Sequence, residues 1–114
     1  MREPWTVAAH IGHKAIADFD KALEISPNYP SMLSNRGRTY VDLGQVDRGL
    51  IDIERSLAIS PVANAYKNRG IAYIRKGELD RGISDLNRAI ELDPRIAQAM
   101  RIGRSSTSRG TAST

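Results

Sequence analysis

The chain contains no cysteine, and its 114 residues include only one phenylalanine and one tryptophan. Without cysteine it can form neither a disulfide nor a thiolate metal site, which predicts a reducing compartment, the cytoplasm. A single compact core would usually bury more large aromatic side chains. No apolar run reaches the roughly 18 residues that a membrane-spanning helix needs, and the N-terminal sequence MREPWTVAAHIGHK lacks an apolar stretch of signal-peptide length.

The net charge of +4 is concentrated at one end of the chain. Residues 95–114 carry four arginines and no acidic residue, whereas residues 1–94 hold 13 basic and 13 acidic residues. The body therefore has no charge excess that would attract nucleic acid or an anionic membrane. Only the tail, with its arginines among serines and threonines, could make weak contacts with such partners.

An internal repeat organises the chain. Shifting the sequence by 33 residues aligns Asn35-Arg36-Gly37 with Asn68-Arg69-Gly70, and Pro61 with Pro94. A shift of 34 aligns Pro27 with Pro61. Each repeated unit therefore closes at a proline, a residue that cannot continue a helix.

Each unit is predicted to contain two helices. Apolar residues at positions 46, 50, 53 and 57, and again at 79, 83, 86 and 90, follow the steps of one helical stripe. The first halves, 30–43 and 63–76, begin after a linker, and Pro30 suits a first helical turn. Gly44 and Gly77 are placed to end these first helices. Asp47 and Asp80 are predicted to cap the second helices.

Units of two helices closed by proline resemble the tetratricopeptide repeat family. The third unit carries the family's pattern at Tyr66, Gly70, Tyr73, Gly77, Leu86, Ala89 and Pro94. The second unit carries it at Leu33, Gly37, Tyr40, Gly44, Ile53 and Pro61. The first unit keeps only the second helix, with Ala15, Phe19, Ala22 and Pro27. The resemblance implies an all-α fold, a short right-handed α-solenoid of antiparallel helix pairs.

This pattern divides the chain into three parts. Residues 1–12 are expected to be a degenerate N-terminal segment, in which Trp5 and Val7 cover the apolar face of a helix over 15–25. Residues 13–94 hold the repeats: a half repeat at 13–27 and full repeats at 28–61 and 62–94. Residues 95–114 are expected to form a helix stub and a disordered, basic, Ser/Thr-rich tail.

The family resemblance implies a protein–protein interaction adaptor, in which the first helices line a groove that holds a peptide or helix of a partner. The groove residues predicted from this resemblance are Ser34, Asn35, Arg38, Asp42, Asn64, Lys67, Asn68, Ile71 and Arg75. Their mainly basic character favours an acidic or mixed peptide. An alternative is a self-associating module, or a fragment of a larger array, whose uncapped ends contact another copy and whose tail makes weak anionic contacts.

Other chemistries find little support in the sequence. His10 and His13 could share a helix face, but they have no nearby carboxylate to complete a metal site and are interpreted as part of a linker. The carboxylates of Asp18, Asp20, Glu24, Asp52 and Glu54 are interpreted as solvated helix surface. We see no phosphate-binding glycine loop and no nucleophile motif, so an enzyme, a cofactor and a metal are not expected.

Two pairs of glycines interrupt the predicted helices, Gly37 with Gly49 and Gly70 with Gly82. Glycine inside a helix costs about 1 kcal/mol relative to alanine. We expect each pair to let the two helices of a unit approach closely. Because the family usually has alanine at the position of Gly82, the sequence predicts that Gly82→Ala is neutral or stabilising.

Overall fold

The computed structural model describes residues 4–103, and all regular secondary structure in this part of the chain is helical. The helices are α1 (Pro4–Ile25), α2 (Pro30–Asp42), α3 (Val46–Ile59), α4 (Ala63–Lys76), α5 (Leu79–Leu92) and α6 (Arg95–Gly103). The all-α prediction is confirmed. The predicted tail beyond Gly103 lies outside the described residues.

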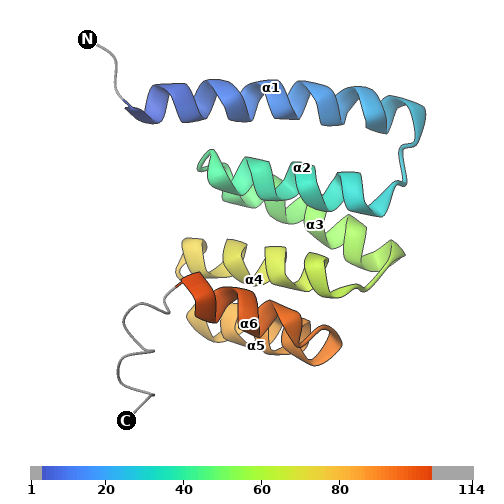
Figure 1. Ribbon diagram of the computed structural model, residues 1–114. Helices are drawn as coiled ribbons and strands as arrows, with labels where there is room; N and C mark the ends of the chain where they lie inside the picture. The colour runs from blue at the N-terminus through green and yellow to red at the C-terminus, as the bar shows by residue number, and fades with distance from the viewer. Residues whose placement is uncertain (1–3, 104–114) are drawn as a thin grey trace.

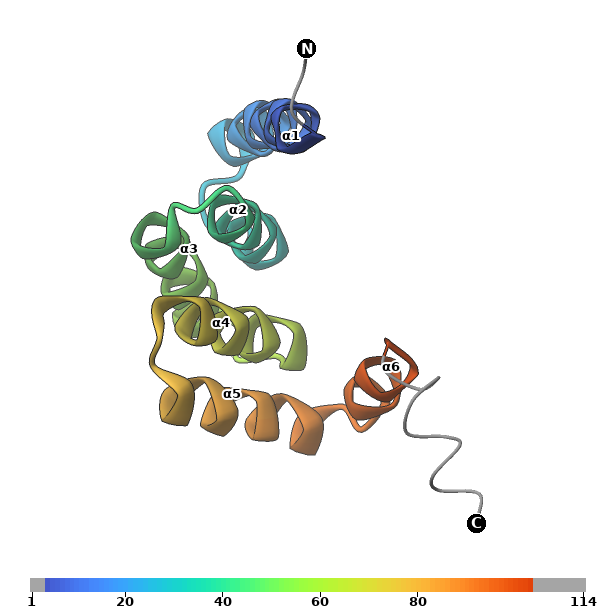
Figure 2. The same ribbon diagram turned by 90° about the vertical axis from the view of Figure 1, so that its left-hand side faces the viewer.

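The helices form two antiparallel hairpins with a further helix at each end (Figure 1). Helix α2 pairs with α3, and α4 pairs with α5, while α4 also packs on both helices of the preceding hairpin. Helix α1 packs on α2, and α6 packs at the end of α5. Figure 2 shows that this row of helices is curved and that α6 projects away from the line of the others. The predicted short solenoid of helix pairs is thereby confirmed.

The turns within the two hairpins depend on glycine. Gly44 and Gly77 have φ angles of 88° and 94°, in the left-handed region that favours glycine. At the end of α4 the Gly77 N–H donates to the carbonyl of Ile74, and the Glu78 N–H donates to that of Tyr73. The predicted role of both glycines is confirmed, as is the place of Pro30 at the start of α2.

The second helices begin two residues earlier than the predicted aspartate caps suggest. The N-cap residues of α3 and α5 are Gln45 and Glu78, and neither makes a side-chain capping hydrogen bond. The prediction that Asp47 and Asp80 are N-caps is wrong, since both lie in the first turn of their helices. In that position their charge still interacts favourably with the helix dipole.

The paired glycines mark the closest approach within each hairpin. A Cβ atom built on Gly37 would lie 2.6 Å from the carbonyl oxygen of Gly49. One built on Gly82 would lie 2.5 Å from Cγ1 of Ile74 and 2.8 Å from the carbonyl oxygen of Gly70. The predicted close approach is confirmed. The prediction that Gly82→Ala is harmless is wrong, because the new methyl group would overlap the facing helix.

The N-terminal part of the chain is one continuous helix rather than a separate segment. Helix α1 has 22 residues and crosses the predicted boundary after residue 12. His10 and His13 lie within it, so their interpretation as a linker pair is wrong. Val7 belongs to the same helix as residues 15–25 and is exposed, so it cannot fold over them. Gly12 does not break the helix, and its backbone lies against the side chain of Leu43.

Each hairpin contains a partly buried arginine–aspartate pair. Arg36 donates to both carboxylate oxygens of Asp52, over 2.7 and 2.9 Å, and Arg69 binds Asp85 in the same way, over 2.8 and 2.9 Å. Arg36 also reaches Asp20 of α1 over 2.8 Å. The hydrogen bond to Asp85 is the main reason why the pKa of Arg69 is raised above its ordinary value.

These pairs correct one sequence-based interpretation. Asp52 is only 4% exposed, so describing it as solvated helix surface was wrong. Asp20 is half-buried and paired, whereas Asp18, Glu24 and Glu54 are exposed as predicted. A signal was present in the sequence, because the same arginine–aspartate separation of 16 residues occurs in both full repeats.

Candidate partner-binding groove

All nine predicted groove residues lie on α2 or α4, two helices that pack side by side (Figure 1). Most of them follow steps of three and four residues along one side of each helix, whereas Ser34 and Asn68 turn toward the contact between the helices. Helix α2 contributes Ser34, Asn35, Arg38 and Asp42, and helix α4 contributes Asn64, Lys67, Asn68, Ile71 and Arg75. The structure brings five of them into one hydrogen-bonded set along the contact between the helices.

The inner part of this set is buried. The Asn68 side-chain amide donates to Ser34 Oγ over 2.8 Å and to the Ser34 carbonyl over 3.4 Å. Ser34 and Asn68 are 2% and 3% exposed. The Asn68 carbonyl oxygen accepts a long hydrogen bond, 3.5 Å, from Arg38. The amide of Asn68 is thus occupied in joining α2 to α4, so neither Asn68 nor Ser34 is exposed to contact a partner.

Ser34→Ala should therefore weaken the contact between α2 and α4. The buried Asn68 amide would lose its short acceptor, which costs about 1–2 kcal/mol of unfolding free energy. Urea unfolding followed by circular dichroism measures this change. Ser31→Ala, an exposed change in the same helix, is the matched control and should stay within about 0.5 kcal/mol of the parent. Equal stabilities for the two variants would contradict this role of Ser34.

The outer part of the set is a charge cluster open to solvent. Asp42 Oδ1 accepts from Arg38 Nε over 3.1 Å and from Arg75 Nη1 over 3.0 Å. The side chains of Arg75 and Asp42 are 46% and 47% exposed. Ion pairs this exposed contribute at most about 1 kcal/mol each. Both arginines can therefore exchange Asp42 for a carboxylate of a ligand at little cost.

Beside this cluster, α4 offers both an apolar and a basic surface. Ile71 and Lys67 are half-exposed, and Asn64 is exposed. Lys67 matches Ser34 at the shift of 33, yet only Ser34 is covered by the first helix of the next unit. The reason is that α6, which follows α5, packs at the end of that helix and projects away (Figure 2).

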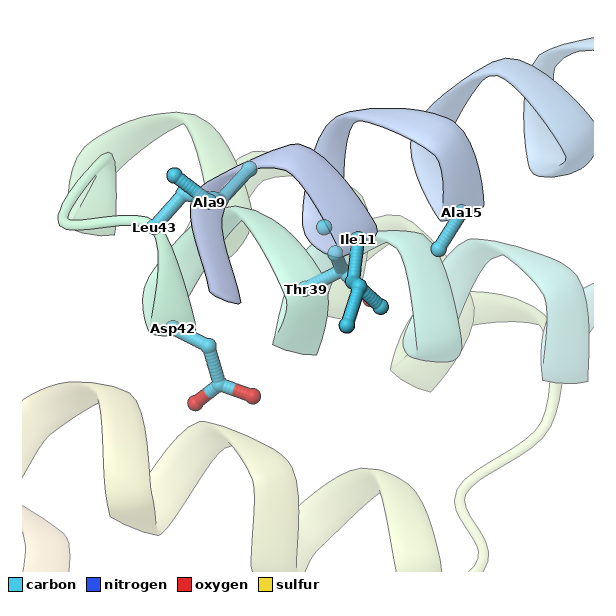
Figure 3. Close-up of a pocket in the computed structure, with 7 residues that line it drawn as sticks. Ala9, Ile11, Ala15, Thr39, Asp42 and Leu43 are labelled. Carbon is cyan, nitrogen blue, oxygen red and sulfur yellow. The ribbon is translucent and has the colours of Figure 1, made fainter. Parts of the chain in front are cut away.

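A cleft lies between α1 and α2, and sequence reasoning missed it. This cleft of about 590 Å³ is lined by Ala9, Ile11, Gly12, Ala15, Thr39, Asp42 and Leu43 (Figure 3). The sequence assigned residues 1–12 to a separate segment and so placed nothing beside the end of α2. The signal that could have revealed it is the lack of a strong helix breaker between Trp5 and Ile25.

The described residues show neither a metal site nor a membrane span. No group of three or more His, Cys, Asp or Glu side chains among them could hold a metal ion. Within the same part of the chain, every helix is too short or too polar to cross a membrane.

Residues 63–96 match the family model of the tetratricopeptide repeat. A search of curated protein sequences found nothing similar to the chain. The matching segment spans α4, α5 and the start of α6, so it includes the half of the groove that carries Lys67, Ile71 and Arg75.

Proposed function

Because residues 63–96 are a tetratricopeptide repeat within a short array of helix pairs, we propose that this protein is a non-enzymatic adaptor. It holds a peptide or helix of another protein in the groove along α2 and α4, and it acts in the cytoplasm. Tetratricopeptide repeats are in general protein-interaction modules. The observation that carries the proposal is the open row of Lys67, Ile71 and Arg75 beside the exposed Arg38–Asp42 pair.

The chemistry of this row selects the partner. Arg38, Lys67 and Arg75 outnumber the single acid Asp42, so a carboxylate-bearing segment is favoured. Ile71 adds an apolar contact between the charges. We therefore propose an acidic or mixed peptide that places a carboxylate near Arg75 and an apolar side chain on Ile71.

Lys67→Ala and Ile71→Ala should each weaken peptide binding about tenfold, the equivalent of about 1.4 kcal/mol. The probe is a fluorescein-labelled library of acidic peptides that each carry one leucine, with fluorescence anisotropy as the measurement. A basic library of the same length should bind poorly.

Matched controls lie on the outer surface of the array. Lys21→Ala on α1 and Ile51→Ala on α3 remove the same side chains from exposed positions and should leave affinity unchanged. If the controls lose as much affinity as the groove variants, or if the basic library binds as well as the acidic one, this function is wrong.

A further inference from the structure

The two ends of the array carry complementary halves of a hairpin. At the shift of 34, Ala15 and Phe19 of α1 match Gly49 and Ile53 of α3, so α1 has the register of a second helix. At the shift of 33, Gly103 of α6 matches Gly70 of α4, so α6 has the register of a first helix. The described residues thus hold three first helices and three second helices, with one of each unpaired.

The exposure of residues on α2 shows where, beside α1, a first helix is lacking. In α4, three positions are buried against the preceding hairpin, with exposures of 0%, 3% and 0%: Ala65, Asn68 and Ala72. The residues of α2 at the matching positions are half-exposed: Met32, Asn35 and Thr39. Within residues 4–103 only α1 packs on this side of α2, so half of the expected cover is missing.

The cleft between α1 and α2 lies at this place (Figure 3). Ile11 and Ala15 line it from α1, and Thr39 and Asp42 line it from α2. Ile11 is 63% exposed, although it is apolar. The cleft therefore has an apolar floor, and Asp42 at its side is already paired with Arg38 and Arg75.

Helix α1 carries a further carboxylate three residues after Ala15, which lines the cleft. Asp18 matches Asp52 and Asp85 in the repeat register, and each of those binds an arginine from the first helix of its own hairpin. Asp18 is exposed, since its hairpin has no first helix among the described residues. A helix with small residues and positive charge would fit this place.

We infer that the missing first helix is α6 of a second copy of this chain, so that copies associate head to tail. Helix α6 follows α5 as a first helix would, and it has no acid. At the shift of 33 its Ile102 stands where Arg36 and Arg69 stand, so the charge for Asp18 comes from the neighbouring Arg101. Arg95 is already held by Asp93. Ala99 and Gly103 of α6 are four residues apart and share one helix face, and Gly103 matches Gly70, so this face suits a close approach to Ala15. The junction would complete one hairpin and leave each internal copy with every helix paired. Such a contact joins two different surfaces, so it extends into chains rather than closing as a symmetric dimer.

The test measures the mass of the full chain by size-exclusion chromatography with light scattering over a concentration series. The wild-type average mass should rise with concentration beyond that of a dimer. Ala15→Glu, which puts a bulky charged side chain into the apolar cleft, and Ala99→Glu, which puts one on α6 against the cleft and near Asp18, should each stay monomeric. Ala17→Glu and Gln98→Glu make the same change in charge at neighbouring exposed positions and should associate like the wild type.

Mixing the two variants that cannot self-associate, Ala15→Glu and Ala99→Glu, tests the direction of the contact. The Ala15→Glu copy keeps an intact α6, and the Ala99→Glu copy keeps an intact cleft, so the mixture should form a dimer and stop there. A monomeric wild type, a mixture that stays monomeric, or controls that fail like the blocked variants would overturn the inference. The inference does not depend on the proposed groove, and peptide binding by the blocked variants tests that function separately.

Discussion

Replacing Gly82 with alanine is expected to lower the free energy of unfolding by about 2 kcal/mol. Alanine is the better helix former by about 1 kcal/mol, so helix propensity alone predicts the opposite sign. The added Cβ atom, however, would lie 2.5 Å from Cγ1 of Ile74 and 2.8 Å from the backbone oxygen of Gly70. Because one of these neighbours is backbone, the whole of α4 has to move away from α5.

Urea unfolding of Gly82→Ala and of Ser84→Ala separates the gain in helix propensity from the crowding between α4 and α5. Ser84 is exposed on the same helix, so its replacement reports helix propensity without crowding. We expect Ser84→Ala to be neutral or slightly stabilising and Gly82→Ala to be destabilising. If Gly82→Ala were the more stable of the two, the close approach of α4 and α5 would not constrain this position.

Arg36→Leu is expected to destabilise the protein by about 3–4 kcal/mol. The substitution leaves the carboxylate of Asp52, which is 4% exposed, without the arginine that holds both of its oxygens. It also removes the bond from Arg36 to Asp20, which ties α1 to the rest of the array. Thermal unfolding should show a lower midpoint and an earlier loss of α1.

Two further variants define the cause of that loss. Replacing both partners, Arg36→Leu with Asp52→Leu, removes the unpaired charge and should recover most of the stability. Lys76→Leu breaks the exposed pair with Asp47, where the side chains are 41% and 82% exposed, and should cost less than about 1 kcal/mol. A double variant as unstable as Arg36→Leu alone would show that lost packing, and not the stranded carboxylate, causes the effect.

Much of the fold could be predicted because the residues that start and end helices recur from one repeat to the next. Pro30, Gly44 and Gly77 each act through the local backbone, and local rules placed them correctly. The start of α1 could not be predicted in this way. The family resemblance implied a separate segment up to residue 12, whereas α1 runs through Gly12 and packs beside Leu43.

The candidate groove was predictable only in outline. Helical spacing put the nine residues on α2 and α4, and the structure places all of them on these two helices, with Ser34 and Asn68 buried between them. Helical spacing does not show which side chains make hydrogen bonds inside the protein. It therefore did not reveal that Asn68 is buried against Ser34. The burial of Asp52 was missed for a related reason, since it depends on an arginine in another helix.

The arginine–aspartate pairs also bear on how quickly the chain folds. Each pair joins residues only 16 positions apart, so closing it orders a short loop. Chains dominated by such local contacts fold fast, and in repeat arrays folding can start in any unit and spread to its neighbours. Either hairpin, α2–α3 or α4–α5, can therefore serve as the nucleus, with α1 and α6 added last and lost first.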